Sequence, residues 1–202
     1  MSEAALRTFV AVPLPAQVKA ALGDLGARIR AEGLPGRWVP PENIHLTLAF
    51  LGDTEAAAVP RIGAALTEAA GGCPAFHLTP TGLGVFPGRR RARVLWVGLQ
   101  GCPEALEALG EAVRRALAQM GYSPPRRGAV GHLTLARAKE MFDPARLAAV
   151  FDRYRTFTGP SFHVDHIVLY RSVPGSGPAR YSPLATVALG VTGAPVTTGG
   201  KP

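Results

Sequence analysis

Hydrophobic residues recur at the three- and four-residue spacing of an amphipathic helix in four stretches of the chain. Two stretches follow Pro15 and Pro103, and another follows Asp143–Pro144, residue types that favour a helix start. The four apolar stripes are Val18, Leu22, Leu25 and Ile29; Val59, Ile62, Leu66 and Ala69; Leu106, Leu109, Val113 and Leu117; and Leu147, Val150, Phe151 and Tyr154. The pattern therefore predicts four helices, each with one face directed towards a core.

Between these stretches lie short runs of alternating apolar and polar residues, which are typical of half-buried strands. The expected strands are 7–12, 44–50, 76–85, 94–99, 132–137, 162–170 and 181–189. Alternation of this kind favours antiparallel pairing, with one face of each sheet buried.

The word HLTL occurs twice, at 45–48 and 132–135, and the elements around it repeat as well. Each half runs strand, helix, HLTL strand, helix and a strand that begins with Phe-His. From Val10 to His45 is 35 residues, and from Trp96 to His132 is 36. We therefore expect an α+β fold of two pseudo-symmetric lobes, each an antiparallel sheet covered by helices, with the active-site cleft between them. Residues 1–189 would form this single bilobal domain with an internal duplication, and 190–202 would form a disordered tail.

The alternation of side chains along a strand assigns each letter of the word to a face. His45 and Thr47 share one face, about 7 Å apart along the strand. Leu46, Leu48 and Phe50 share the other face, which we expect to contact the helices. The second copy places His132 and Thr134 outward, and Leu133 and Leu135 inward. If the lobes are related by an approximate twofold axis, the two His-Thr pairs face each other.

Two imidazoles facing each other across a basic groove suit in-line displacement at phosphorus. One histidine takes a proton from the attacking water and the other gives a proton to the departing oxygen, while the threonines bind the remaining phosphate oxygens. The spacing of His45 and His132 is not that of metal ligands, and no H-x-x-x-H or carboxylate-rich cluster lies near them. We therefore expect neither a metal nor another cofactor. A single H-x-T word would be typical of an ordinary half-exposed strand; its repetition favours the catalytic interpretation.

Composition fits a chain of 202 residues with a substantial core, since 47% of the residues are hydrophobic. The formal charge of +8 comes mostly from arginine, whose planar guanidinium suits phosphate, although a GC-rich genome would also enrich arginine. The apolar runs are short and the start lacks a leader pattern, which predicts a cytoplasmic protein without a membrane partner.

Arginines also cluster near the repeated words. The candidate RNA-binding residues are Arg89, Arg90, Arg91, Arg126, Arg127 and Arg137. Arg137 lies five residues after His132, so only a bend or a bulge would turn it to the histidine face. For the three arginines of the turn, a solvated hairpin tip is an equal alternative.

Three further histidines and two cysteines fall outside this scheme. We expect His77, His163 and His166 to occupy exposed strand positions without a catalytic role. If the turn between the strands 76–85 and 94–99 is centred between Pro87 and Gly88, Cys73 and Cys102 lie opposite each other in a hairpin. Both thiols would be reduced in a cytoplasm.

The chain resembles the two-histidine (2H) phosphoesterase superfamily, and specifically the bacterial and archaeal RNA 2′,3′-cyclic phosphodiesterases, also called 2′-5′ RNA ligases. The resemblance rests on LRTFVAV, WVPPENIHLTLAFLG, GLGVFP, RVLWVGL, GHLTLAR and IVLYRSVPGSGPARY, which together span most of the chain. It implies metal-independent hydrolysis of RNA 2′,3′-cyclic phosphate ends to 2′-phosphomonoesters, with reversible 2′-5′ ligation as a related reaction. It also implies that His45 is the proton donor, that His132 is the proton acceptor, and that Thr47 and Thr134 bind phosphate. One position differs from the family pattern: Gly131 stands immediately before the second histidine, where proline is common.

The implied partner is RNA with a 2′,3′-cyclic phosphate end, tRNA fragments included, and the expected state is a monomer. Two alternatives stay open at this point. A non-catalytic RNA-binding module would need the arginines but not a matched acid and base. A phosphodiesterase acting on small cyclic nucleotides or nucleotide-sugar derivatives would use the same two histidines.

Overall fold

Two antiparallel sheets form the framework of the computed structural model, which describes residues 5–123, 131–175 and 177–190. The first sheet has the strand order β3-β1-β8-β9, and the second has the order β2-β6-β5-β4-β7. The strands of the first sheet are β1 (Leu6–Val12), β3 (Leu46–Thr54), β8 (His166–Val173) and β9 (Arg180–Ala188). The strands of the second sheet are β2 (Arg37–Trp38), β4 (Phe76–Phe86), β5 (Val94–Gly101), β6 (Leu133–Arg137) and β7 (Phe162–Val164).

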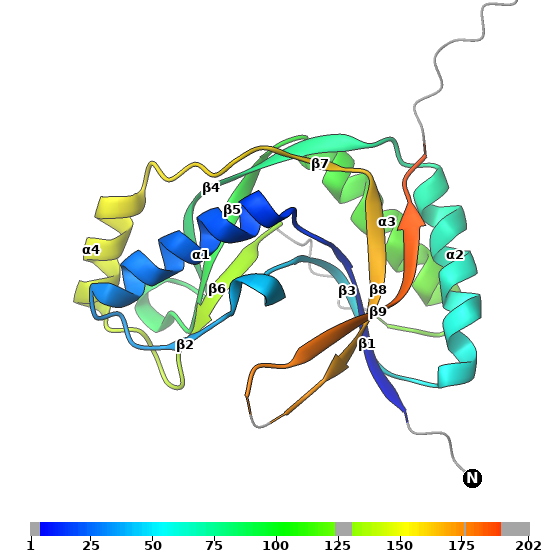
Figure 1. The fold of residues 1–202 in the computed structure, drawn as a ribbon, viewed down its shortest axis with the longest axis horizontal. Coiled ribbons are helices and arrows are strands. Elements are labelled where there is room, and N and C mark those ends of the chain that lie inside the picture. The colour runs from blue at the N-terminus through cyan, green and yellow to red at the C-terminus, as the bar shows by residue number, and fades with distance from the viewer. Residues whose placement is uncertain (1–4, 124–130, 176, 191–202) are drawn as a thin grey trace, which may run out of the picture.

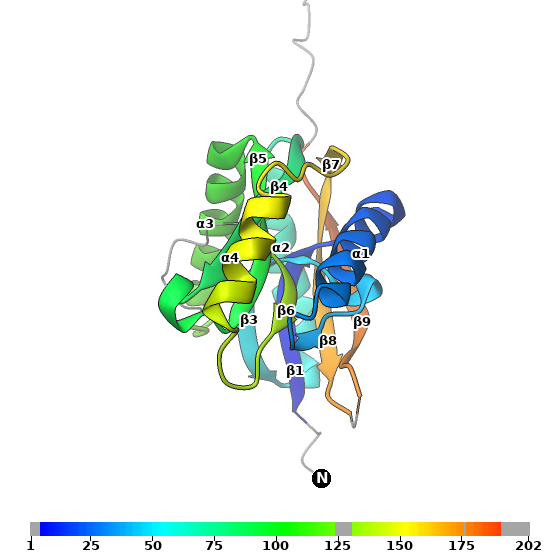
Figure 2. The same ribbon diagram turned by 90° about the vertical axis from the view of Figure 1, so that its left-hand side faces the viewer.

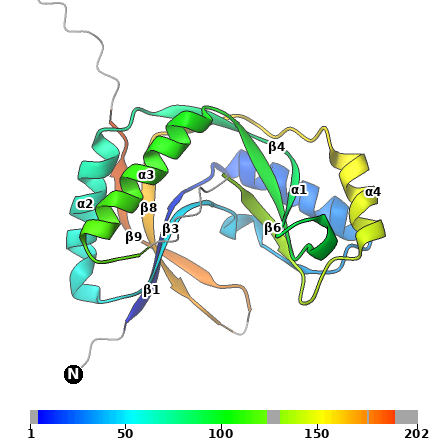
Figure 3. The same cartoon turned by 180° about the vertical axis from the view of Figure 1, so that it is seen from behind.

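Four α-helices are present where the hydrophobic spacing predicts them: α1 (Ala16–Ala31), α2 (Val59–Gly71), α3 (Pro103–Gln119) and α4 (Pro144–Tyr154). Helices α2 and α3 pack against the first sheet, whereas α1 and α4 pack against the second (Figures 1 and 3). Figure 2, seen from the side of α1 and α4, has the other two helices behind the sheets. The expected α+β fold of two sheets, each covered by helices, is confirmed. In α2 the stripe is buried through Ala70 rather than the expected Ala69.

Each lobe combines elements from both halves of the sequence. Strand β1 of the first half pairs with β8 of the second half, and strands β5 and β6 of the second half pair with β4 and β2 of the first, respectively. The helices follow the same exchange, because α1 contacts β6 and α3 contacts β3 (Figure 1). The two halves of the sequence therefore do not fold into two separate lobes that follow each other along the chain. Spacing along the chain could not reveal this exchange.

The two Phe-His words meet in the second sheet. Strands β4 and β7 pair so that His77 lies opposite His163, with Phe76 opposite Val164 and Leu78 opposite Phe162. Corresponding positions of the two halves are thus paired symmetrically about one point. This is the pattern that a local twofold axis through the His77–His163 pair produces.

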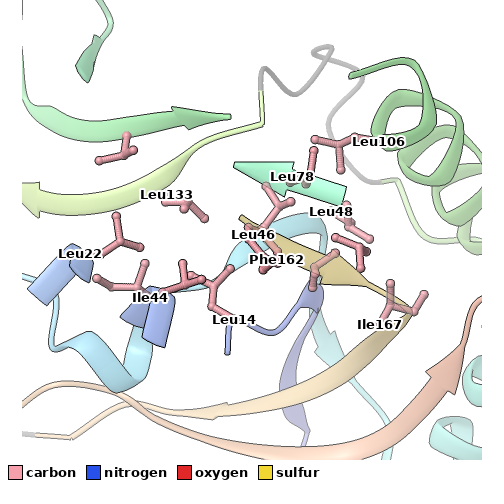
Figure 4. Packing of buried hydrophobic residues seen from close by; sticks show 14 of the residues in the cluster. Leu14, Leu22, Ile44, Leu46, Leu48, Leu78, Leu106, Leu133, Phe162 and Ile167 are labelled. Carbon is pink, nitrogen blue, oxygen red and sulfur yellow. The ribbon is translucent and has the colours of Figure 1, made fainter. Parts of the chain in front are cut away.

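Leucines of the two HLTL words are buried together in a shared core. Leu46 and Leu133 are 1% and 0% exposed, and both belong to one hydrophobic cluster. Figure 4 shows these two side chains in the same region, with Leu22 of α1 and Leu106 of α3 near its two ends. The core therefore continues from one lobe to the other and fixes the inward face of both words.

A β-bulge interrupts both HLTL strands at the same letter. In β3 the paired residues skip Leu48, and in β6 they skip Leu135. An extra residue reverses the alternation beyond it. Phe50 therefore lies on the histidine side and is 56% exposed, so the expectation that it faces the core is wrong. The bulge in β6 likewise turns Arg137 to the side of His132 and Thr134. A bulge of this kind was the condition for Arg137 to reach the histidine face.

The expected strand 162–170 is wrong as one element. It is divided at Asp165 into β7, which belongs to the second sheet, and β8, which belongs to the first. The chain crosses between the lobes at this residue, and the backbone N–H of Leu189 donates to the Asp165 carbonyl. Strand β2 was not predicted at all, because two residues carry no periodic signal.

The prediction that Cys73 and Cys102 lie opposite each other in the hairpin is also wrong. Leu78 pairs with Gly101, so the register differs by several residues from one that places Cys73 opposite Cys102. The turn contains a short 3₁₀ helix, η3 (Arg89–Arg91), and is therefore centred later than the sequence suggested. Both cysteines are free thiols, with Cys73 buried at the end of α2.

The expected disordered tail lies outside the described residues except at its first position. There the backbone N–H of Gly190 donates to the carbonyls of Ala70 and Cys73, so Gly190 still belongs to the fold. Within the described ranges, no helix is long and apolar enough to cross a membrane.

The start of α4 gives a test of the local structure. The Asp143 carboxylate accepts a hydrogen bond from the backbone N–H of Arg146 at 2.8 Å, and Pro144 occupies the first turn. We expect Asp143→Ala to lower the free energy of unfolding by about 1 kcal/mol, because a helix N–H loses its acceptor. Urea denaturation measures the change. Asp143→Asn retains an oxygen acceptor and should stay near the wild type; equal stability of all three proteins would contradict the capping role.

Candidate active site

The two His-Thr pairs lie on the open faces of the two sheets. His45 immediately precedes β3 and His132 immediately precedes β6, and both are partly exposed, as are Thr47 and Thr134. The intervening leucines, Leu46 and Leu133 in the first place, are buried. We call the four residues His45, Thr47, His132 and Thr134 the interlobe site.

The two halves of the interlobe site lie within electrostatic range of each other. Electrostatic interactions with His132 and Arg137, both from the second sheet, lower the pKa of His45 of the first sheet. Arg137 also acts on Tyr181 of β9. The open faces of the two sheets therefore meet, and side chains that are far apart in the sequence act on one another.

A hydrogen bond to the backbone orients the His45 ring. Its Nδ1 lies 2.8 Å from the carbonyl oxygen of Asn43, at the end of η1 (Pro41–Asn43). A carbonyl can only accept, so Nδ1 carries the proton and Nε2 is left for chemistry. The Asn43 side chain in turn donates to the carbonyl of Ala179 at 2.8 Å, which joins this turn to the start of β9. Sequence reasoning missed Asn43, although it lies only two residues before the histidine.

Burial lowers the pKa of the His45 imidazole below its ordinary value of 6.5. The hydrogen bond to Asn43 opposes this shift, whereas the positive charges of Lys19, His132 and Arg137 add to it. In the free protein, His45 is therefore mainly neutral at pH 7.

Aromatic rings enclose both histidines, and the sequence did not predict them as part of the site. The Phe9 ring lies 4.7 Å from the His45 ring, and the Tyr181 ring approaches it edge-on at 5.3 Å. Around His132, Phe86 lies edge-on at 5.0 Å and Trp96 lies at 6.0 Å. Phe9 and Trp96 come from β1 and β5, which are next to the HLTL strands, whereas Phe86 and Tyr181 come from β4 and β9, each two strands or more away. Only knowledge of the strand pairing could have identified them.

The candidate arginines lie in different parts of the structure. Arg137 lies at the interlobe site, as described above. Arg89, Arg90 and Arg91 form η3 at the tip of the β4–β5 hairpin, where all three are exposed. The Arg89 guanidinium lies over the Phe151 ring of α4 at 4.4 Å, which commits it to a packing contact. Arg126 and Arg127 lie outside the described residues.

The remaining histidines lie away from the interlobe site. His77 and His163 are exposed and face each other across β4 and β7, with ring centroids 4.7 Å apart. His166 is partly exposed and lies 2.5 Å from the Asp165 carboxylate. Within the part of the chain that the structure describes, no group of three or more His, Cys, Asp or Glu residues is arranged to hold a metal ion.

Comparison with known proteins agrees with this geometry. The family described as LigT like Phosphoesterase matches residues 12–96 and 97–179. Similar curated proteins include the RNA 2′,3′-cyclic phosphodiesterases of Thermotoga maritima, 29% identical over 88% of this chain and 100% of that protein, and of Aquifex aeolicus, 35% identical over 75% and 82%.

Solved structures give the same result. A Thermus thermophilus protein, 26% identical, superposes over 93% of this chain and 100% of its own with a TM-score of 0.76. Escherichia coli LigT in complex with 3′-AMP, 31% identical, superposes over 92% and 98% with a TM-score of 0.68.

The electrostatic environment of His45 can be tested by a single charge removal. Lys19→Gln should raise the pKa of His45 towards 6.5, because a positive charge that opposes protonation is lost. An NMR titration of the His45 ring measures this shift. Arg30→Gln, at the exposed end of α1, removes the same charge and should leave the titration unchanged. An unmoved or lowered pKa in the Lys19 variant would refute the assigned cause.

Proposed function

The chain belongs to the LigT-like phosphoesterase family, and we propose that it is an RNA 2′,3′-cyclic phosphodiesterase whose catalytic pair is His45 and His132. The substrate is RNA that ends in a 2′,3′-cyclic phosphate, and the product is a 2′-phosphomonoester. One observation carries this proposal: two identical His-Thr pairs, each oriented by buried leucines, meet across two sheets. A module that only binds RNA needs no such matched pair.

The reaction is an in-line displacement at phosphorus. Neutral His132 accepts a proton from water as the water oxygen attacks phosphorus, and the bond from phosphorus to the 3′ oxygen breaks. His45 gives its Nε2 proton to that 3′ oxygen, so the sugar leaves with a 3′ hydroxyl and a 2′ phosphate. The hydroxyls of Thr47 and Thr134 donate to the non-bridging phosphate oxygens, where negative charge accumulates.

The lowered pKa of His45 makes its protonation depend on the substrate. In the free protein the imidazole is mainly neutral at pH 7, which does not suit a proton donor. A bound phosphate brings negative charge next to the ring and favours the imidazolium. The hydrogen bond to Asn43 also favours the charged ring, so the ring keeps its orientation when it is protonated. The substrate thus promotes formation of the acid that its own cleavage requires.

The finer assignments extend the same proposal. Residues 1–189 act as one bilobal domain with an internal duplication, and the protein works as a monomer in the cytoplasm. Exposed Arg90 and Arg91 at the hairpin tip contact longer RNA, such as tRNA fragments, through its phosphates. The same site supports reversible 2′-5′ ligation when product ends are abundant.

Replacement of either histidine tests the mechanism. His45→Ala and His132→Ala should each reduce kcat for an RNA with a 2′,3′-cyclic phosphate end by at least about 100-fold, as expected when a general acid or base is lost. The double variant should lose little more than either single variant, because the two residues act in one step. Rates should be unchanged by a chelator.

His163→Ala provides the matched control, since His163 is also a strand histidine but lies away from the interlobe site. It should keep wild-type turnover. A catalytic single variant that is folded by circular dichroism and retains most of its activity would refute the two-histidine mechanism for this protein.

The pH dependence should show the effect of the substrate on His45. The profile of kcat/KM reports the free enzyme and should be bell-shaped. Because the proton donor His45 must be protonated and its pKa is lowered, the loss of activity that accompanies its deprotonation should begin at lower pH than an ordinary imidazole would give. The profile of kcat reports the bound state and should lie at higher pH, since the phosphate charge raises the pKa. Initial rates between pH 4 and pH 9 measure both. Coincident profiles would show that the substrate does not change the protonation of the pair.

A further inference from the structure

Two arginines lie directly opposite each other at the edge of the second sheet. Arg37 of β2 pairs with Arg137 of β6 in an antiparallel register. Side chains of directly opposed residues point to the same face, and like charges in that position repel each other. Among the residues that the structure describes, neither guanidinium forms an ion pair with a carboxylate. An anion placed between the two guanidiniums would remove this repulsion.

The face that carries these arginines is the catalytic one. The bulge at Leu135 turns Arg137 to the side of Thr134, and the charge of Arg137 acts on both His45 and Tyr181. Arg37 shares that side because it is the paired residue. With one bulge residue between them, Thr134 and Arg137 are separated by two strand steps, about 7 Å. One ribose unit can bridge that separation.

A groove adjoins the arginine pair. It has a volume of about 600 Å³ and is formed by the loop before β2 and the segment from the end of β6. Its walls include one carboxylate and three cationic side chains: Glu140 against Arg37, Arg137 and Lys139. The excess of positive charge favours an anionic occupant.

In the facing lobe, a phenylalanine occupies the position that corresponds to Arg137. Phe50 follows HLTLA in β3 where Arg137 follows HLTLA in β6, so the two residues occupy corresponding positions beyond matching bulges. Phe50 continues into a row of rings with Phe9 and Tyr170, at 5.9 Å and 5.3 Å between successive centroids. The site therefore has identical catalytic pairs but different ends, one aromatic and one cationic. A substrate with one further phosphate can bind in only one favourable direction.

We propose that Arg37 and Arg137 form a second phosphate subsite, which binds the phosphate on the 5′ oxygen of the terminal nucleotide. This inference rests on the proposed function, because it takes the cyclic phosphate to lie at the interlobe site. The subsite distinguishes the end of an RNA chain from a free nucleoside cyclic phosphate, which lacks that second phosphate. Arg37 and Arg137 act here by binding and orienting the substrate, and they transfer no proton.

The test compares two substrates that differ only in this phosphate: adenosine 2′,3′-cyclic phosphate with a 5′ hydroxyl, and the same compound with a 5′ phosphate. The wild type should have a higher kcat/KM for the 5′-phosphorylated compound. Arg37→Gln should reduce that preference by about tenfold, the usual size of a lost charge-assisted hydrogen bond. Arg30→Gln removes an equal charge on α1 and should keep the wild-type preference. A preference that Arg37→Gln leaves unchanged, or an equal loss on both substrates, would overturn the proposal.

An equilibrium measurement separates the subsite from the proposed function. Calorimetry with adenosine 2′-monophosphate and adenosine 2′,5′-bisphosphate gives the contribution of the 5′ phosphate without any turnover. Arg37→Gln should abolish most of the added affinity of the bisphosphate, and high salt should have the same effect on the wild type. Should the protein bind in this way and hydrolyse neither cyclic compound, the proposed function fails and the anion subsite stands. If it hydrolyses both but the bisphosphate gains no affinity through Arg37, the subsite fails and the function stands.

Discussion

The alternation of side chains along β3 and β6 is the constraint on which the site depends. Burial of a leucine side chain contributes about 1.5–3 kcal/mol, so a one-residue slip that exposed Leu46 and Leu48 would lose about 3–6 kcal/mol. The same slip would turn His45 and Thr47 into the core. Burial of these leucines therefore sets the direction of the polar side chains, although the leucines themselves lie on the opposite face of the strand. The bulge at the end of each word then turns one further residue, Phe50 or Arg137, to the side of the His-Thr pair.

Symmetry in the framework is combined with chemical difference at the site. The pairing of His77 with His163 relates the two halves about one point, and the exchanged strands join the lobes through a continuous core. Yet His45 is held by the Asn43 carbonyl and enclosed by Phe9 and Tyr181, and its pKa is lowered by burial. The proposed acid and base need different environments, and the surroundings of the two identical words supply that difference.

Local patterns predicted the parts of this molecule that local forces determine. Helical spacing located the four α-helices of the described ranges, and strand alternation placed each His-Thr pair on the opposite face from a pair of buried leucines. Strand exchange, the bulges and the aromatic enclosure of the histidines depend on contacts between distant segments, which one sequence does not display. The cysteine prediction shows the limit well. A 3₁₀ helix in a turn displaced the register by several residues, and arithmetic from an assumed turn centre could not detect it.

Identification of the product tests the central claim most directly. The protein is incubated, with a chelator present and in water enriched in oxygen-18, with a short RNA that ends in a 2′,3′-cyclic phosphate. Phosphorus NMR and mass spectrometry then identify the ester. In-line attack by water with departure of the 3′ oxygen predicts a 2′-phosphomonoester that contains one oxygen-18 atom on phosphorus. A 3′-phosphomonoester, or an RNA end that remains cyclic, would contradict the account.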